Sequence, residues 1–381
     1  MRILQLANFY HDRSGGLRTA IDAFASGYVA AGHEVFVVVP ADRRGVREID
    51  GKTVITLRSP RLPAASDYRT IVDQRAVSAL VGALRPDVIE LSDRTTLARI
   101  VVNLPRRPPV VLYSHERLDL AAARVAPSLL RPTRLVNAWT KRLAARVDTI
   151  VCASDFAAAE FEQLTPSCIR RVPLGVDLET FCPVAHDEPP LSATLGWSAG
   201  AHHRAVYVGR LSPEKHPHDA VAAVARLVRS GRFTELLVVG DGPQREELAL
   251  SSRGLPVRFI GHVDDRAMIA ALLRRADVAI VPSPNETFGL ACLEAMACGT
   301  PVATVRGGAV HELVTAGSGA VAGPGIDGLA SAIASVFQGS RSLQRVEARS
   351  RAEEFPWRRS VDAMLDIHAH AVHSQEFAAA G

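Results

Sequence analysis

Two cationic side chains stand five positions apart in the segment YVGRLSPEKHP. Arg210 and Lys215 follow a short apolar run that predicts a β-strand, and Pro213 and Pro217 restrict the loop that carries them. A planar guanidinium and a compact ammonium at the end of a strand suit a diphosphate ligand. We therefore expect a diphosphate site here, and an ordinary solvated loop is the alternative.

Two carboxylates surround the start of a predicted helix in VPSPNETFGLACLEAMACGTPV. Glu286 precedes the first turn, expected at Phe288, Gly289 and Leu290, and Glu294 lies about one turn farther on the same face as Leu290. Amides at the start of a helix favour an anion, whereas carboxylates accept hydrogen bonds from sugar or ribose hydroxyls. The alternative for Glu286 is a simple favourable interaction with the helix dipole.

Two more loops follow predicted strands in the first half of the chain. In NFYHDRSGGLRTAI, Gly15 and Gly16 precede a helix, so that bare backbone amides could face a phosphate or a sugar. In PVVLYSHERLD, His115 stands at a strand end, where an imidazole could take part in catalysis. The alternatives are a glycine turn that needs a positive φ and a purely structural histidine.

The surrounding sequence predicts the elements that position these loops. Strand-like runs alternate with amphipathic segments, which is typical of parallel sheets with crossover helices. The predicted strands are 2–7, 34–40, 52–57, 87–91, 108–115, 148–154 and 169–175, followed by 205–210, 235–242, 257–263, 276–283 and 301–305. We expect an α/β chain of two Rossmann-like, doubly wound domains, with ligands in a cleft at the carboxyl ends of their strands.

Length and composition narrow the possible classes of protein. The 381 residues favour two domains, which we place at 1–185 and 186–359 because a polar, proline-bearing linker follows Val184. No apolar stretch is long enough to span a membrane and no signal peptide is evident, so a cytoplasmic protein is expected. Five cysteines without a C-x-x-C pair, and the absence of a D-x-D motif, predict neither metal nor cofactor, and a net charge of +4 does not indicate nucleic acid.

Four segments stand in order along the second half: GRLSPEKHP, VVGDGP, FIGHV and ETFGLACLE. With the glycine-rich first loop and the histidine after a middle strand, they make the chain resemble the retaining GT-B glycosyltransferases of family 4. Within that family it looks most like the actinobacterial GDP-mannose-dependent phosphatidylinositol mannoside mannosyltransferases. The resemblance implies transfer of mannose from GDP-mannose to a phosphatidylinositol mannoside glycolipid, α(1→6) onto the dimannoside to give the trimannoside. Retention needs either a carboxylate nucleophile, for which Glu286 is the one candidate, or same-face attack, which is how the family is usually described.

The resemblance also implies a role for each candidate residue. It assigns the donor diphosphate to Arg210 and Lys215, and the hydroxyls of the donor sugar to Glu286. Glu294 would bind the ribose hydroxyls, and Val263 would contact the nucleobase. The amides of Phe288, Gly289 and Leu290 would lie near the sugar and the phosphate. The loop of Gly15 and Gly16 would close on the diphosphate, and His115 would contact the sugar near the reacting carbon.

A glycolipid acceptor implies that the first domain faces a membrane. Residues 120–147 hold six basic residues and no acidic one, with an apolar stripe of Leu135, Val136, Trp139, Leu143 and Val147. Such a helix is a candidate for peripheral contact with anionic lipid at the inner face of the cell membrane. The alternative is a stripe that packs on its own sheet. The resemblance further implies that a last helix, 360–376, packs back on the first domain.

Other interpretations remain open at this point. One is a family 4 transferase that uses a UDP-sugar and another lipid or a soluble acceptor, and a related one is a sugar-nucleotide epimerase. A non-catalytic module that binds a nucleotide sugar is another. A Rossmann dehydrogenase is disfavoured because neither half carries G-x-G-x-x-G with an acidic residue about 20 positions later.

Overall fold

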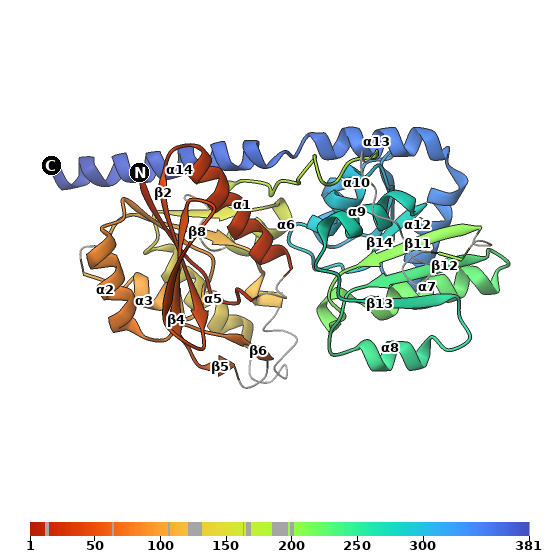
Figure 1. Cartoon of the computed structure of the whole chain (residues 1–381), viewed down its shortest axis with the longest axis horizontal. Helices are drawn as coiled ribbons and strands as arrows, with labels where there is room; N and C mark the ends of the chain where they lie inside the picture. Colours follow the sequence, from red (N-terminus) through yellow and green to blue (C-terminus); the bar gives the residue numbers. More distant parts are fainter. Residues whose placement is uncertain are drawn as a thin grey trace. The chain divides into compact units, whose positions relative to one another are not determined.

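The computed structural model describes residues 1–11, 15–62, 65–105, 107–120, 132–162, 164, 169–184, 197–198 and 202–380. Two compact units make up the chain (Figure 1): Met1–Leu174 with Trp357–Gly381, and Gly175–Pro356. Each unit has its own sheet and its own core. The two units are therefore described separately.

The first unit is built on an eight-stranded sheet of order β10-β9-β8-β7-β1-β2-β4-β3, in which only β3 is antiparallel to its neighbour. Its elements are β1 (Arg2–Leu6), α1 (Gly16–Ala30), β2 (Glu34–Ala41), β3 (Gly45–Ile49), β4 (Lys52–Arg58), β5 (Arg61–Leu62), β6 (Ala65–Arg69), α2 (Gln74–Leu84), β7 (Val88–Leu91), α3 (Thr96–Val101), β8 (Val110–Ser114), α5 (Pro132–Ala144), β9 (Thr149–Cys152), α6 (Asp155–Glu162), β10 (Ile169–Arg171) and α14 (Trp357–Ala380).

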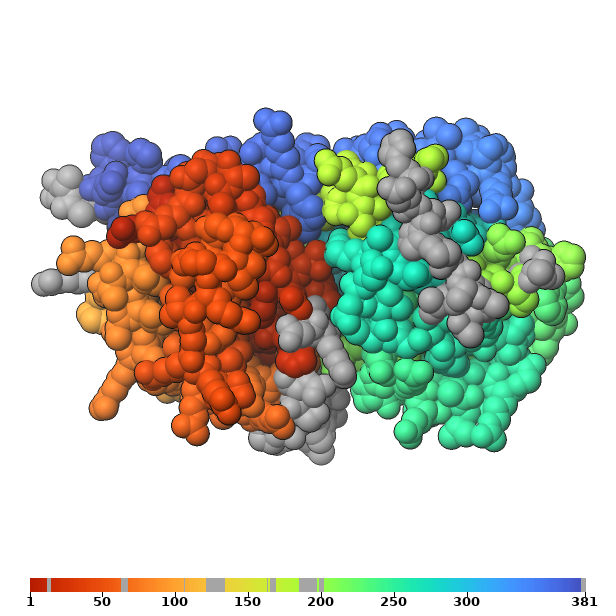
Figure 2. Space-filling view, viewed as in Figure 1, coloured from red at the N-terminus to blue at the C-terminus, as the bar shows by residue number. Residues whose placement is uncertain are grey.

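Both faces of this sheet are covered by helices, which explains why its strands are apolar almost without interruption. Leu4 and Leu6 point to the face packed by α2, α3, α5 and α6. Alternate residues point the other way, where α1 and α14 pack. The edge strand β3 is exposed along its whole length. In the space-filling view, residues from the red-to-orange part of the chain form much of the visible face of this unit (Figure 2).

The terminal helix α14 belongs to the first unit, where it lies beside α1 (Figure 1). Gly27 of α1 makes room for it, because a Cβ at that position would lie 2.4 Å from Cγ2 of Val361. Tyr28, the residue after Gly27, donates a 2.8 Å hydrogen bond to Glu90. Glu90 also accepts one from Gln5 (2.9 Å), and its carboxylate lies 3.2 Å from His368 of α14. These neighbours lower the pKa of the buried Glu90 carboxyl, against the opposing effect of burial.

The second unit contains a fully parallel six-stranded sheet of order β13-β12-β11-β14-β15-β16. Its elements are β11 (His203–Val208), the 3₁₀ helix η3 (Pro213–Lys215), α7 (Pro217–Arg229), β12 (Thr234–Val239), α8 (Arg245–Ser251), β13 (Val257–Gly261), α9 (Arg266–Arg275), β14 (Val278–Val281), α10 (Leu290–Ala297), β15 (Val302–Val305), α11 (Val310–Leu313), β16 (Gly319–Ala322), α12 (Gly325–Gln338) and α13 (Arg341–Glu353).

The first unit ends at Leu174, earlier than the boundary at residue 185 that the sequence suggested. Residues 175–184 pack with the second unit because Arg349 of α13 donates hydrogen bonds to the carbonyls of Leu178 (3.3 Å) and Phe181 (2.9 Å). The Phe181 side chain is fully buried. A short apolar anchor of this kind carries no periodic signal, whereas the polar linker after Val184 does stand out in the sequence.

Candidate active site

Two loops of the second unit leave the sheet side by side. β11 pairs in parallel with β14, so the loop that carries Arg210 and Lys215 and the loop that carries Glu286 start from the same edge. The Ser283 hydroxyl donates a 2.7 Å hydrogen bond to the carbonyl of Glu214 and joins the two loops directly. The carboxyl ends of neighbouring parallel strands thus bring both cation-bearing and acidic segments to one place.

Lys215 and Glu286 meet at this edge. The Lys215 ammonium lies 2.7 Å from one carboxylate oxygen of Glu286 and 2.8 Å from the other. The exposed fraction is 37% for the lysine side chain and 15% for the glutamate, so the pair is partly shielded from water. The sequence predicted each residue separately, and the structure brings the two into contact.

Arg210 begins the same loop, with an exposed side chain. The Tyr207 hydroxyl donates to its carbonyl at 2.9 Å. The VVGDGP segment packs against the loop so closely that a Cβ on Gly240 would lie 1.9 Å from the Gly209 carbonyl oxygen, and one on Gly242 would lie 2.4 Å from that of Leu211. The glycines of this motif are therefore needed for a close backbone approach that fixes the loop of Arg210.

Helix α10 begins at Leu290, where the sequence predicted a helix to start near Phe288, Gly289 and Leu290. Gly289 is its N-cap with φ of +103°, and Phe288 beside it is buried. The carbonyl of Glu286 accepts a 2.7 Å hydrogen bond from the Ala309 amide, and a Cβ on Gly308 would lie 2.9 Å from the Glu286 nitrogen. Gly308 was not among the predicted site residues, although the Gly-Gly pair after the strand 301–305 was the available signal.

Glu294 lies on α10 with its side chain 14% exposed, and it has a cationic partner that the sequence did not predict. Arg266, the first residue of α9, donates to Glu294 Oε1 at 3.2 Å. Burial raises the pKa of the Glu294 carboxyl to about 7, and the nearby Arg266 opposes that shift. Val263 stands half-buried in the loop between β13 and α9.

In the first unit, His115 follows the carboxyl end of β8 and stacks on Tyr113, with ring centroids 4.6 Å apart. Burial lowers the pKa of His115 to about 4. The imidazole is therefore neutral near pH 7, able to donate one hydrogen bond and accept another but not to act as a cation.

A buried ion pair holds the His115 loop in place. The Arg94 guanidinium binds both carboxylate oxygens of Glu160 at 3.0 and 2.9 Å, and both side chains are almost completely buried. Arg94 also donates to the carbonyl of Glu116, and the Leu118 amide donates to Glu160 at 3.2 Å. The backbone after His115 is thus fixed by two partners from distant parts of the chain. Sequence patterns gave no signal for this pairing.

Gly15 and Gly16 stand at the start of α1 and are both exposed. Neither has a positive φ, so a turn that requires glycine for that reason does not explain them. A Cβ on Gly15 would meet nothing within 4 Å, so the space beside it is open. Ser14, the preceding residue of the motif, lies outside the described residues.

The apolar stripe proposed for membrane contact divides into two parts. Leu143 and Val147 are buried in the core of the first unit and Trp139 packs against them, so this part follows the alternative of a stripe packed on its own sheet. Leu135 remains 73% exposed beside Arg134. Residues 121–131 lie outside the part of the chain that the structure describes. None of the helices among the described residues has both the length and the apolar composition needed to span a membrane.

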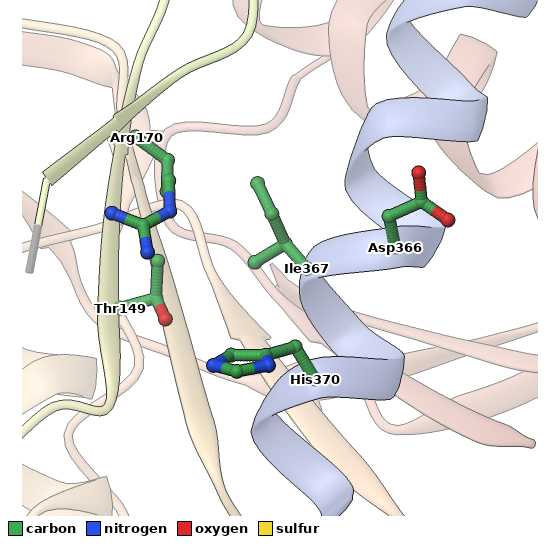
Figure 3. A pocket seen from close by; sticks show the side chains of 5 residues that line it. All are labelled: Thr149, Arg170, Asp366, Ile367 and His370. Atoms are coloured by element: carbon green, nitrogen blue, oxygen red, sulfur yellow. The ribbon is translucent and has the colours of Figure 1, made fainter. Parts of the chain in front are cut away.

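A hollow of about 290 Å³ lies in the first unit, and none of the candidate residues of that unit lines it. Thr149 at the start of β9 and Arg170 of β10 line one side, and Ile367 and His370 of α14 extend toward them (Figure 3). His115 instead follows the carboxyl end of β8, which runs parallel to β9. The hollow is thus at the amino-terminal side of the sheet, opposite the edge where ligands of such sheets bind.

Comparison with known proteins decides the family. Residues 14–180 match the model described as Glycosyltransferase Family 4, and residues 200–353 match Glycosyl transferases group 1. A GDP-mannose-dependent alpha-(1-6)-phosphatidylinositol dimannoside mannosyltransferase from Mycobacterium tuberculosis is 40% identical over 368 residues, which cover 96% of this chain and 95% of the relative. The chain belongs to the family 4 glycosyltransferases. The sequence-based expectation of a glycosyltransferase of this family is confirmed.

Other relatives of this family 4 glycosyltransferase agree on the fold and class. A GDP-mannose-dependent alpha-mannosyltransferase from Mycolicibacterium smegmatis is 28% identical over 319 residues, 82% of each chain. Sucrose-phosphate synthase from Thermosynechococcus elongatus superposes with a TM-score of 0.81 at 22% identity over 100% of both chains. Anabaena HepE, in complex with UDP and glucose, has a TM-score of 0.75 at 20% identity, covering 97% of this chain and 99% of its own. The GT-B fold expected from the sequence is confirmed.

Proposed function

We propose that this glycosyltransferase moves mannose from GDP-mannose to a phosphatidylinositol mannoside glycolipid, forming an α(1→6) bond on the dimannoside to give the trimannoside. The donor and acceptor follow the name of the Mycobacterium tuberculosis relative, which is 40% identical over nearly the whole chain. The observation that carries the proposal is the contact of Lys215 with Glu286. It joins a cation suited to a diphosphate with an acceptor suited to sugar hydroxyls.

The donor groups are assigned to residues of the second unit as follows. Arg210 and Lys215 hold the diphosphate, together with the amides of Phe288, Gly289 and Leu290 at the start of α10. Glu286 accepts hydrogen bonds from the sugar hydroxyls, Glu294 from the ribose hydroxyls, and Val263 contacts the nucleobase. These assignments agree with the preference of helix N-termini and cations for phosphate and of carboxylates for diols.

Residues of the first unit complete the proposed machinery. Gly15 and Gly16 stand at the start of α1, where Gly15 adjoins open space, and both are assigned to the diphosphate. His115 is assigned to the sugar near the reacting carbon. Because it stays neutral, His115 acts there as a hydrogen-bonding group and adds no positive charge beside a developing oxocarbenium ion.

Departure of the diphosphate is the step that the second unit is suited to assist. As the anomeric C–O bond breaks, negative charge grows on the leaving phosphate, and fixed cations stabilise it without reorganisation. Retention of configuration would follow from same-face attack, with the leaving phosphate taking the proton of the acceptor hydroxyl. Both carboxylate oxygens of Glu286 accept from Lys215. Such engaged oxygens suit Glu286 to the role of hydrogen-bond acceptor better than to that of nucleophile.

The proposed acceptor is a membrane lipid, so we include peripheral contact with an anionic membrane from the cytoplasmic side. Exposed Arg134, Leu135, Lys141 and Arg142 on α5 support this part of the proposal. Sedimentation with vesicles that contain anionic lipid should fall for Leu135→Asp and for Lys141→Glu. Equal sedimentation with neutral and anionic vesicles would contradict it.

The decisive experiment supplies purified protein with radiolabelled GDP-mannose and phosphatidylinositol dimannoside. A labelled trimannoside, with an α(1→6) bond established by linkage analysis, is the expected product. UDP-glucose and UDP-N-acetylglucosamine serve as competing donors, and transfer from either in place of GDP-mannose would support the UDP-sugar alternative. Binding without turnover by any donor, unchanged in Lys215→Ala, would favour the non-catalytic module.

A further inference from the structure

The contact between Lys215 and Glu286 creates a competition inside the proposed donor site. This inference rests on the proposed function, which gives the ammonium to the diphosphate and the carboxylate to the sugar. In the structure the same two groups bind each other through both carboxylate oxygens. A diphosphate that approaches Lys215 must therefore weaken that contact, and it brings further negative charge close to Glu286.

Glu286 has little freedom to withdraw from the incoming anion. Its carbonyl is held by the Ala309 amide at 2.7 Å, and its backbone lies against Gly308 with no room for a Cβ between them. The Ser283 hydroxyl ties the same loop to the Glu214 carbonyl. Lys215, by contrast, carries its charge on a flexible four-carbon stem and is 37% exposed. The lysine is therefore the partner that moves.

The two possible ligands differ in what they offer Glu286 in return. A nucleoside diphosphate that carries a sugar presents hydroxyls, which donate to the carboxylate and replace the hydrogen bonds from Lys215. A free nucleoside diphosphate presents none, so Glu286 is left partly shielded beside phosphate with its cation withdrawn. An acidic group in that situation is destabilised by both desolvation and like charge.

We propose that Glu286 discriminates between the sugar-nucleotide donor and the free nucleoside diphosphate product by competing for Lys215. The competition weakens binding of any diphosphate, and only the sugar of the donor compensates for it. Glu286 thereby favours release of the product after transfer. This is a specificity role in addition to its contact with the sugar.

Calorimetric titration of the full chain with GDP and with GDP-mannose, in the absence of acceptor, tests the proposal. Glu286→Gln should bind GDP roughly fivefold more tightly than wild type, the size expected when a partly shielded ion pair no longer competes. Its affinity for GDP-mannose should be unchanged or weaker, because the amide replaces the carboxylate at the sugar. The ratio of the two affinities therefore shifts toward the product.

A matched control separates this effect from general electrostatics. Glu214→Gln removes one acidic charge from the neighbouring loop, where the Glu214 carboxylate accepts from the Ser212 hydroxyl. It should change the two affinities by the same small factor. A gain in GDP affinity equal to that of Glu286→Gln would overturn the proposal.

A double-mutant cycle tests whether Lys215 carries the effect. In a Lys215→Met background the Glu286→Gln change should no longer improve GDP binding, because nothing remains to compete for. A gain that persists overturns the proposal, as does an absent gain in the wild-type background. If Glu286→Gln does not fold, Glu286→Asp replaces it, and its shorter side chain should give a smaller gain in the same direction.

Failure of the inference and failure of the proposed donor give different results. Wild-type protein that binds GDP with the same affinity as Glu286→Gln overturns the inference alone. Wild-type protein that binds neither GDP nor GDP-mannose overturns the proposed donor, and the competition for that donor with it. Product inhibition in the transferase assay provides a second readout, since GDP should inhibit Glu286→Gln more strongly than wild type.

Discussion

At the scale of single residues, the candidate site depends on charges that have direct partners. Lys215 binds Glu286, and Glu294 binds Arg266, each through a contact between loops or helices that are far apart in the chain. His115 has no cationic form near neutral pH because burial lowers its pKa to about 4. Burial thus sets the charge states of Glu294 and His115.

Replacement of either side chain proposed to bind the diphosphate should mainly lower turnover. Arg210→Ala and Lys215→Ala should each lower kcat/KM by two to three decades, or roughly 3–4 kcal/mol, because charge on the leaving diphosphate is no longer stabilised. Steady-state kinetics with GDP-mannose measures the effect. Arg226→Ala is the matched control, since Arg226 is an exposed cation of the same unit that pairs with Asp327 on the surface. A loss of less than tenfold in both site variants would contradict the assignment.

The raised pKa of Glu294 predicts two pH effects. Nucleotide binding that needs the ionised carboxylate should strengthen as pH rises through about 7, and Glu294→Gln should lose that dependence. The GDP affinity of wild type and of Glu294→Gln should be measured between pH 6 and 8. Because the phosphate of GDP titrates in both series, the difference between the two proteins reports on Glu294 alone.

The same shift affects stability with a definite sign. The folded Glu294 carboxyl keeps its proton to about pH 7, whereas the unfolded one loses it near 4.5, so the folded chain binds more protons between these values. The free energy of unfolding should therefore decrease as pH rises through this window, and Glu294→Gln should reduce that slope. An unchanged slope in urea unfolding series would count against the raised pKa.

At the scale of elements, buried polar contacts fix the loops that follow the strands. The Arg94–Glu160 pair joins the loop after β7, the loop after β8 and helix α6, and Trp139 of α5 donates to the Arg94 carbonyl at 2.7 Å. Three elements of the first unit thus meet at the ion pair, and α5 contacts the backbone of Arg94. We expect it to position the backbone that carries His115.

Breaking that pair should be costly. Glu160→Ala leaves Arg94 buried without its carboxylate, and we expect a loss of about 3–5 kcal/mol in the free energy of unfolding, measured by urea denaturation. Glu162→Ala provides the control on the same helix, because Glu162 is exposed and its pairing with Arg171 should contribute less than about 1 kcal/mol. Equal losses in the two variants would show that the buried pair has no special weight.

At the scale of the whole molecule, the chain leaves the first unit, builds the second and returns through α14. The return depends on close packing, since Val361 occupies the space that a side chain at Gly27 would need and Trp357 packs edge-on against Phe24 with ring centroids 5.5 Å apart. His368 of α14 reaches the buried Glu90 of β7. The last helix is therefore part of the core of the first unit.

A substitution at this contact should test how closely α14 is fitted. Gly27→Ala should destabilise the protein by about 1–3 kcal/mol, because its Cβ would overlap Val361, and Val361→Ala should relieve much of that loss in the double variant. Thermal unfolding of the two single variants and the double variant measures the coupling. Simple additivity of the two losses would mean that the helix adjusts freely.

Much of the fold could be predicted from local pattern, and the exceptions have physical causes. The twelve predicted runs are all strands in the structure, because buried parallel strands need continuous apolar residues. β3 was missed because all five of its residues are exposed, and β16 because GAVA is too small and short to form a clear apolar run. The loops of Arg210, Glu286 and His115 were predicted because they directly follow such runs.

The sequence by itself determined the types of the chemical groups and their attachment to strand ends, since both depend on neighbours along the chain. Only the tertiary structure decided which groups meet. β14 lies next to β11 although β12 and β13 come between them in the sequence, and this order brings Glu286 to Lys215, 71 residues away. Arg94 and Glu160 are likewise joined across 66 residues. Such pairings depend on how the whole sheet packs, because strand order is selected by the core and not by any local segment.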